Sequence, residues 1–255
     1  MQTSSPREIE SQKSSNERSP KKKSLLRMEE SVAIDMLVRY GLSLRRLSSQ
    51  DECTERLKKL LSIMKNHWST KGHVMEYKGF DWLMGILFLI FKGDEGRTFG
   101  VLKSLSTHED ASFIWPSLAM VKEQALHVDA KLFHWIEYIL ERELPHVSAA
   151  FRISGLPPSQ ICQLWRQQCF LNFLNFQDIQ LFIVMCLTMG HDFHVYFMLS
   201  LFRHSKRDIL QQSQEENLLL TLRTMPFNGY QLHEHVDFFL EIQEKYSSDI
   251  LNDFL

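Results

Sequence analysis

Two pairs of histidines are the residues whose types and spacing come nearest to a metal-binding pattern. His191 and His194 lie three residues apart near a predicted helix start, and His233 and His235 lie two apart. Zinc sites combine His with Cys or carboxylate ligands at recurring spacings. Neither pair has such a pattern beside it, so we predict no metal site and expect His191 and His194 to lie at a helix cap and at the edge of the core.

The cysteines are expected to be reduced, mostly buried thiols. The four cysteines are Cys53, Cys162, Cys169 and Cys186, and no two of them form a Cys-x-x-Cys pair. We also find no secretory signal peptide at the N-terminus. Structural disulfides belong to oxidising compartments. The pattern therefore favours a reducing, intracellular location, which we interpret as cytoplasmic.

Charge and motifs argue against several classes of partner and chemistry. The formal net charge of −2 gives no attraction to nucleic acid or to an anionic membrane surface. The sequence has no nucleophile elbow, phosphate-binding loop, dinucleotide fingerprint or His-Glu-x-x-His segment. We predict no cofactor and no nucleic-acid partner.

The longest apolar run, from Trp82 to Phe91, is too short to span a membrane, because a spanning helix needs about 20 such residues. Residues 181–202 are also apolar, but Gly190, His191 and Asp192 interrupt them. The first run predicts a buried core helix, and the second predicts two buried helices joined by a turn. We therefore predict no membrane span.

From Glu29 onward the sequence predicts helices almost throughout. Leu57, Leu60, Leu61 and Met64 recur at the spacing of one helix face. Breaks are predicted at 92–96, 155–158 and 226–229, and no run alternates as a strand would. The predicted fold class is all-α, in one helical domain over residues 29–255.

Residues 1–28 differ in composition from the rest of the chain. They are rich in Ser, Lys, Glu and Arg and hold almost no large apolar residue. Such a segment cannot bury enough surface to offset its ordering entropy. We predict a disordered tail over residues 1–28.

Helix starts can be assigned from capping residues. Ser49 or Asp51 is expected to cap the helix that carries Leu57. Asp129 is expected to cap the helix that carries Phe133, Ile136 and Leu140. Pro157 and Pro158 suit the first turn of a helix, where a missing N–H costs nothing.

Three segments, in order, resemble the Rab GTPase-activating TBC domain. The first is Tyr77-Lys78-Gly79-Phe80 before the apolar helix, where the family has Tyr-x-Gln-Gly-Met. The second is the helix over residues 99–105, which follows a short acidic loop. The third runs from Pro157 to Trp165. The resemblance covers residues 31–255 and implies a TBC-like fold whose N-terminal helices are short or missing, as in an N-terminally truncated chain.

The resemblance also implies where catalytic residues should be, and this chain departs from the family there. TBC domains supply an Arg and a Gln to the bound nucleotide, and the Gln position holds Lys78. The best local candidate for the Arg is Arg39, but the family's Ile-x-x-Asp-x-x-Arg register is not kept around it. Arg45, Arg46 and Arg56 are alternatives without the motif. In the third segment, the family's Arg and Asp correspond to Gln163 and Arg166.

These departures predict a non-catalytic TBC-like scaffold, with Tyr77, Lys78, Gly79 and Phe80 as candidates for lining a binding groove. The stretches 164–172, 191–196, 202–204 and 208–211 resemble one divergent branch of the family. That resemblance implies a role in cilium assembly and Hedgehog signalling, at the cilium or ciliary base, with protein partners such as a kinase or a Rab GTPase. Two alternatives stay open: an active Rab GTPase activator, and a helical interaction domain unrelated to TBC proteins.

Overall fold

The structure of the chain is a computed structural model that describes residues 21–70, 80–108, 111–115, 123–212 and 218–254. Within these ranges the chain forms α-helices and one short 3₁₀ helix, and it contains no strand. The predicted all-α class is therefore confirmed.

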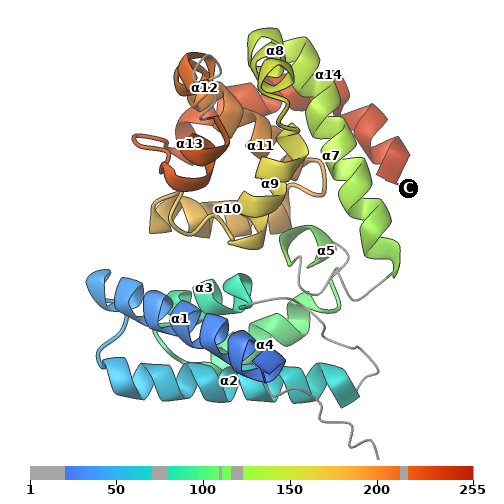
Figure 1. Ribbon diagram of the computed structural model, residues 1–255. Coiled ribbons are helices and arrows are strands. Elements are labelled where there is room, and N and C mark those ends of the chain that lie inside the picture. Colours follow the sequence, from blue (N-terminus) through green and yellow to red (C-terminus); the bar gives the residue numbers. More distant parts are fainter. Residues whose placement is uncertain (1–20, 71–79, 109–110, 116–122, 213–217, 255) are drawn as a thin grey trace, which may run out of the picture.

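The N-terminal helices form one layer, at the bottom of Figure 1. They are α1 (Lys21–Ser43), α2 (Gln50–Thr70), α3 (Trp82–Ile90) and α4 (Glu95–Leu105). Helix α1 packs on α2 and α3, and α4 packs on the same two helices. Every residue of α3 from Leu83 to Leu89 is buried, so the apolar run 82–91 is a core helix as predicted. No helix of the described ranges is long and apolar enough to cross a membrane.

The C-terminal helices form a second layer, shown from green to red in Figure 1. They are α7 (Glu123–Glu143), α8 (Pro145–Ser154), α9 (Pro158–Gln167), α10 (Phe176–Thr188), α11 (Phe193–His204), α12 (Lys206–Gln212), α13 (Leu218–Thr224), η1 (Leu232–His235) and α14 (Val236–Phe254). Helix α11 packs on α7, α10, α12 and α14, and its first ten residues are all buried. Helices α10 and α11 are the two buried helices predicted over residues 181–202.

Aromatic contacts join the two layers. The ring of Tyr40 in α1 meets Phe176 of α10 edge-on, with 6.3 Å between centroids, and the guanidinium of Arg46 lies 5.2 Å from the same ring. The short helix α5 (Ala111–Ile114) lies between the layers in Figure 1. Its Phe113 stacks on His191, with 4.8 Å between ring centroids.

The helix boundaries test the predicted caps. The Ser49 hydroxyl accepts a hydrogen bond from Glu52 N at 3.4 Å, which confirms Ser49 as a cap of α2. Pro158 is the first residue of α9, as predicted. The prediction for Asp129 was wrong, because α7 begins at Glu123 and places Asp129 in its interior. Helix α1 begins at Lys21, within the segment predicted as a tail, and the division at residue 28 stays a prediction.

The crossing of α1 and α3 generates a test of packing. A Cβ at Gly41 would lie 2.5 Å from Leu89 Cδ2 and 2.7 Å from Leu47 Cδ1, and both leucines are buried. We expect Gly41→Ala to lower the free energy of unfolding by about 1–3 kcal/mol, since overpacking forces neighbours to shift. Urea unfolding measures the change.

The matched control is Gly100→Ala in α4, where an added Cβ would have no atom within 4 Å. That variant should raise the free energy of unfolding by up to about 1 kcal/mol, because Ala loses less backbone entropy on folding. Equal effects of the two substitutions would contradict the close packing at Gly41.

Candidate functional site

The segment that carries the TBC-like motif meets the described structure at Phe80. Tyr77, Lys78 and Gly79 lie outside the described residues, so their roles as groove residues stay predictions. The side chain of Phe80 is buried. Its ring meets Trp82 edge-on at 5.1 Å.

Phe80 also fixes the motif against α1. A Cβ at Gly85 would lie 2.8 Å from both Phe80 Cε1 and Leu37 Cδ2. The Phe80 ring and the Leu37 side chain therefore both lie over Gly85, where α3 has no side chain. This contact joins the end of the motif to α1, the helix that also carries Arg39.

Directly after Phe80, Asp81 holds the start of α3. The carboxylate is fully buried. Its Oδ1 accepts from Met84 N at 3.0 Å, and its Oδ2 accepts from Trp115 Nε1 at 2.6 Å. Sequence reasoning missed this residue, although an Asp just before an apolar helix is an N-cap pattern.

Asp81 also lies close to the C-terminal layer. Burial, with the Asp81 charge as a smaller contribution, raises the pKa of Cys169 to about 12. All four cysteines are buried and none forms a disulfide. Cys169 is therefore a protonated core thiol at neutral pH.

Arg39 lies on the solvent side of α1. Its side chain is 70% exposed, and its Nε lies 3.0 Å from Asp35 Oδ2, one turn earlier. The Gln50 amide donates to the same carboxylate at 3.2 Å. Arg39 is thus a surface cation paired within its own helix, and the structure places it on the helix that packs against Phe80.

The other candidate arginines have contacts of their own. Arg46 lies over Phe176, and Arg56 pairs with Glu52 within α2. Arg45 is exposed in the turn that directly follows α1. None of these contacts distinguishes an Arg finger among them.

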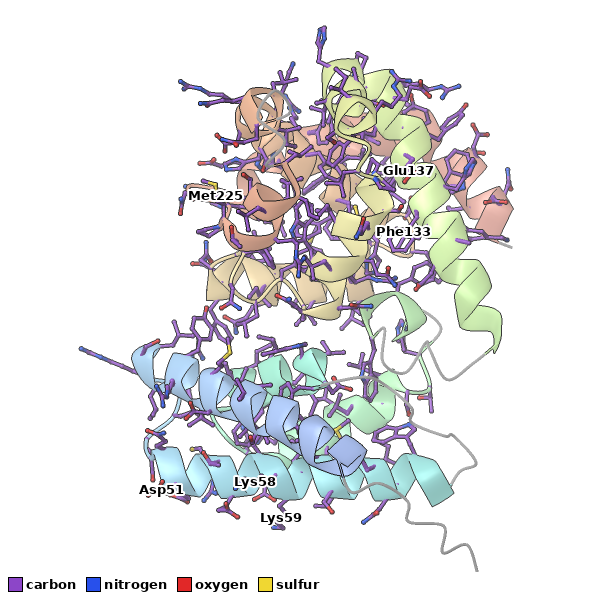
Figure 2. The ribbon with its side chains drawn as sticks, viewed as in Figure 1. Asp51, Lys58, Lys59, Phe133, Glu137 and Met225 are labelled. Carbon is purple, nitrogen blue, oxygen red and sulfur yellow. The ribbon has the colours of Figure 1, made fainter. Side chains whose placement is uncertain are left out.

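In the third segment, the position of the family's Asp holds a buried arginine. The Arg166 side chain is only 2% exposed, and its Nη2 lies 2.6 Å from Asp129 Oδ1 of α7. Its guanidinium lies 5.4 Å from the Phe133 ring centroid. Phe133 lies on the side of α7 that faces α9 in Figure 2. Asp129, in the interior of α7, is therefore an ion-pair partner of α9.

The neighbouring Trp165 is a packing residue of the core. It is fully buried, and its Nε1 donates to Leu222 O of α13 at 3.0 Å. Gln163 lines a pocket of about 270 Å³ between α9 and α13. The third segment therefore ties α9 to α7 and α13.

The histidine segment 191–194 belongs to the core. His194 is fully buried, with the rings of Phe113 and Phe182 each 5.6 Å from its own. Burial, helped by the nearby Arg166 charge, lowers the pKa of His194 to about 3. Among the described residues, no group of three or more His, Cys, Asp and Glu could hold a metal ion.

Asp192 sits at the start of α11 without capping it. Its side chain makes no capping hydrogen bond. Its Oδ2 instead accepts from Tyr196 Oη and from Ser247 Oγ, each at 2.7 Å. Through the hydrogen bond from Ser247, Asp192 joins the start of α11 to α14.

Comparisons with known proteins agree on one family. The family model described as the broad-minded protein Rab TBC domain matches residues 3–255. Protein broad-minded of Danio rerio is 32% identical over 238 residues, which are 88% of this chain and 18% of that protein. Protein broad-minded of Mus musculus is 31% identical over 240 residues, or 87% of this chain and 18% of its own length. The chain thus spans about a fifth of these relatives, and no solved structure matches it significantly.

Removing the Asp81 carboxylate should destabilise the fold. Asp81→Ala deletes a helix cap and leaves the buried Trp115 N–H without its acceptor. We expect the free energy of unfolding to fall by about 2–4 kcal/mol. The control is Asp94→Ala, which deletes the exposed cap of α4, where Asp94 Oδ1 accepts from Arg97 N at 2.9 Å. It should lower the free energy of unfolding by about 1 kcal/mol. A smaller loss for Asp81→Ala than for Asp94→Ala would contradict the buried contact.

Stability should depend on pH through His194. Its folded-state pKa of about 3 lies below the unfolded value of 6.5, so the unfolded chain binds the proton first. The contribution of the neutral ring is complete above pH 6.5 and is lost as pH falls towards 3. Between pH 6.5 and 4.5 this group should lower the free energy of unfolding by about 2 kcal/mol. Urea unfolding measures the free energy of unfolding of wild type and His194→Phe at both pH values. Between pH 6.5 and 4.5 it should fall by about 2 kcal/mol less in His194→Phe than in wild type. Equal changes in the two proteins would contradict the prediction.

Proposed function

The chain belongs to the family of broad-minded Rab TBC domains, and from this membership we propose that it is a non-catalytic TBC-like module that binds protein partners. Membership in this family sets aside the alternative of a helical domain unrelated to TBC proteins. It does not by itself assign activity, because the chain covers only 18% of the length of its broad-minded relatives.

The observation that carries the proposal is Lys78 at the position of the family's Gln. A Gln amide can accept a hydrogen bond from the attacking water and donate another to the phosphate. A Lys ammonium has three donors and no acceptor. It can contact a phosphate as a point charge, but it cannot align the water for in-line attack.

Arg39 and Arg166 support the same proposal. Arg39 lacks the family's register and is paired with Asp35 on the surface of α1. Arg166 replaces the family's Asp and serves a buried ion pair between α9 and α7. In both places, side chains near the family's motif positions contact other parts of this chain.

We further propose, from the likeness to protein broad-minded, that the module acts in cilium assembly and Hedgehog signalling. Its partners would be proteins, such as a kinase or a small Rab GTPase, met in the cytoplasm or at the ciliary base. A helical framework with degraded catalytic positions supports a holding role over a catalytic one.

The alternative is an active Rab GTPase activator that uses displaced residues. Arg39 favours it, because a side chain that is 70% exposed can leave Asp35; exposed pairs of this spacing contribute only about 0.3–0.5 kcal/mol. An Arg finger supplied in trans contributes on the order of 10³ to 10⁵ in rate, so the two functions differ by a large and measurable factor.

Single-turnover GTP hydrolysis on a panel of Rab GTPases separates them. We expect the 255-residue protein to change the hydrolysis rate of each Rab by less than about twofold, far below an Arg-finger effect. The contrary outcome is a rate increase that Arg39→Ala or Lys78→Ala abolishes. Arg97→Ala is the matched control, since Arg97 is an exposed arginine paired with Asp94 within one turn.

A further inference from the structure

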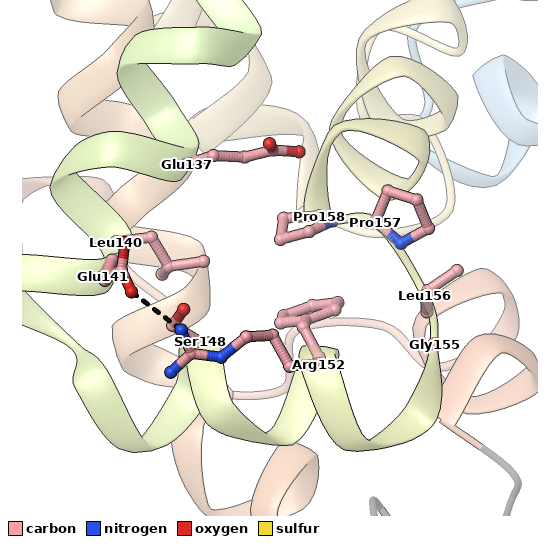
Figure 3. Close-up of a pocket in the computed structure, with 10 residues that line it drawn as sticks. Glu137, Leu140, Glu141, Ser148, Arg152, Gly155, Leu156, Pro157 and Pro158 are labelled. Atoms are coloured by element: carbon pink, nitrogen blue, oxygen red, sulfur yellow. Dashed lines mark hydrogen bonds and ion pairs between the residues drawn. The ribbon is translucent and has the colours of Figure 1, made fainter.

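A pocket of about 360 Å³ opens between α7, α8 and the turn that leads into α9. Figure 3 shows α7 and α8 on one side and the turn over residues 155–158 on the other. Ligand pockets commonly range from about 300 to 1,000 Å³. This one is of a size for one or two side chains of a bound segment.

The inner part of the pocket is apolar. Leu140 of α7, Phe151 of α8 and Leu156 of the turn line it and are themselves buried. Pro157 and Pro158 complete the wall. Because proline fixes its own φ, this wall is held in shape before anything binds, which reduces the ordering cost of binding.

The rim of the pocket carries more negative than positive charge. Glu137 and Glu141 lie one turn apart on α7, and Arg152 Nη1 lies 2.7 Å from Glu141 Oε1. The Glu137 side chain points from α7 towards Pro158 in Figure 3. Its Oε1 accepts from Ser159 N at 3.2 Å, and no cation of the described residues pairs with it. One carboxylate charge at the rim is therefore uncompensated.

We propose that this pocket binds a peptide segment of a protein partner in which an aliphatic or aromatic side chain lies beside a Lys or Arg. The apolar side chain enters between Leu140, Phe151 and Leu156. The cation meets the Glu137 carboxylate, where the excess negative charge of the rim lies. The inference rests on the proposal that the domain binds protein partners, and it names one surface for doing so.

Glu137 also has a structural role from which binding must be separated. Its hydrogen bond to Ser159 N lies in the first turn of α9, where an acceptor stabilises the helix. Glu137→Gln keeps a carbonyl acceptor for that N–H and removes the charge. Loss of peptide binding with little change in thermal stability would therefore report the charge itself.

The experiment selects a phage-displayed library of random twelve-residue peptides on the purified 255-residue protein. We expect enriched sequences to place an apolar residue next to Lys or Arg. The two most enriched peptides are then made with a fluorescent label, and their affinities are measured by fluorescence anisotropy. Glu137→Gln should weaken binding about tenfold, the size of one charge-assisted contact.

Two further variants locate the bound peptide. Ser148→Trp fills the pocket from α8 and should weaken binding more than tenfold, while circular dichroism confirms that the variant is folded. Glu244→Gln changes an exposed carboxylate of α14 that does not line the pocket and should leave the affinity unchanged.

The proposal is overturned if no peptide is enriched, if the enriched peptides lack a basic residue, or if wild type, Glu137→Gln and Ser148→Trp bind with equal affinity. Peptides that bring two protein chains together, seen by size-exclusion chromatography, would point to another surface and also overturn it. None of these results bears on GTP hydrolysis, so failure here and failure of the non-catalytic assignment are distinguishable.

Discussion

The buried carboxylate of Asp81 is the contact on which the arrangement of the N-terminal layer depends. A buried charge is costly unless it is hydrogen-bonded, and Asp81 meets this need with Met84 N at one oxygen and Trp115 Nε1 at the other. The first bond fixes where the apolar helix α3 begins. The second ties that point to the residue after α5. The motif that ends at Phe80 is thereby anchored at its C-terminal end.

A second buried charge, that of Arg166, links two helices of the C-terminal layer through an ion pair. Arg166 needs a carboxylate partner once it is buried, and Asp129 supplies it from α7. Glu137, two turns further along α7, accepts from Ser159 N at the start of α9. These two polar contacts hold α9 along α7 at both of its ends. The proposed peptide pocket lies beside the second contact, so its shape follows from the pairing of these helices.

Much of this fold follows from local patterns in the sequence. The apolar run of α3, the interrupted apolar stretch that forms α10 and α11, the Ser49 cap and the proline start of α9 each depend on neighbouring residues. What the sequence did not predict depends on distant partners. Asp129 has the sequence pattern of a cap, but its carboxylate pairs with Arg166 of α9. The Asp192 carboxylate accepts a hydrogen bond from Ser247 of α14. Local rules fail where a tertiary contact offers the polar group a better partner.

The departures from the TBC motifs have one physical consequence in common: each leaves a side chain that is poorly suited to act on a bound nucleotide. A catalytic groove needs an Arg and a Gln presented to a nucleotide, with few competing contacts of their own. Here Lys78 lacks an acceptor, Arg39 has Asp35 beside it, and Arg166 is committed to the core. These internal contacts of the polar side chains support the proposal that the module is non-catalytic. The Glu137 carboxylate, with which no cation of the described residues pairs, lies away from the motif at a pocket between α7, α8 and the turn before α9. That distribution of charge favours a module whose partners are held by surfaces other than the family's catalytic groove.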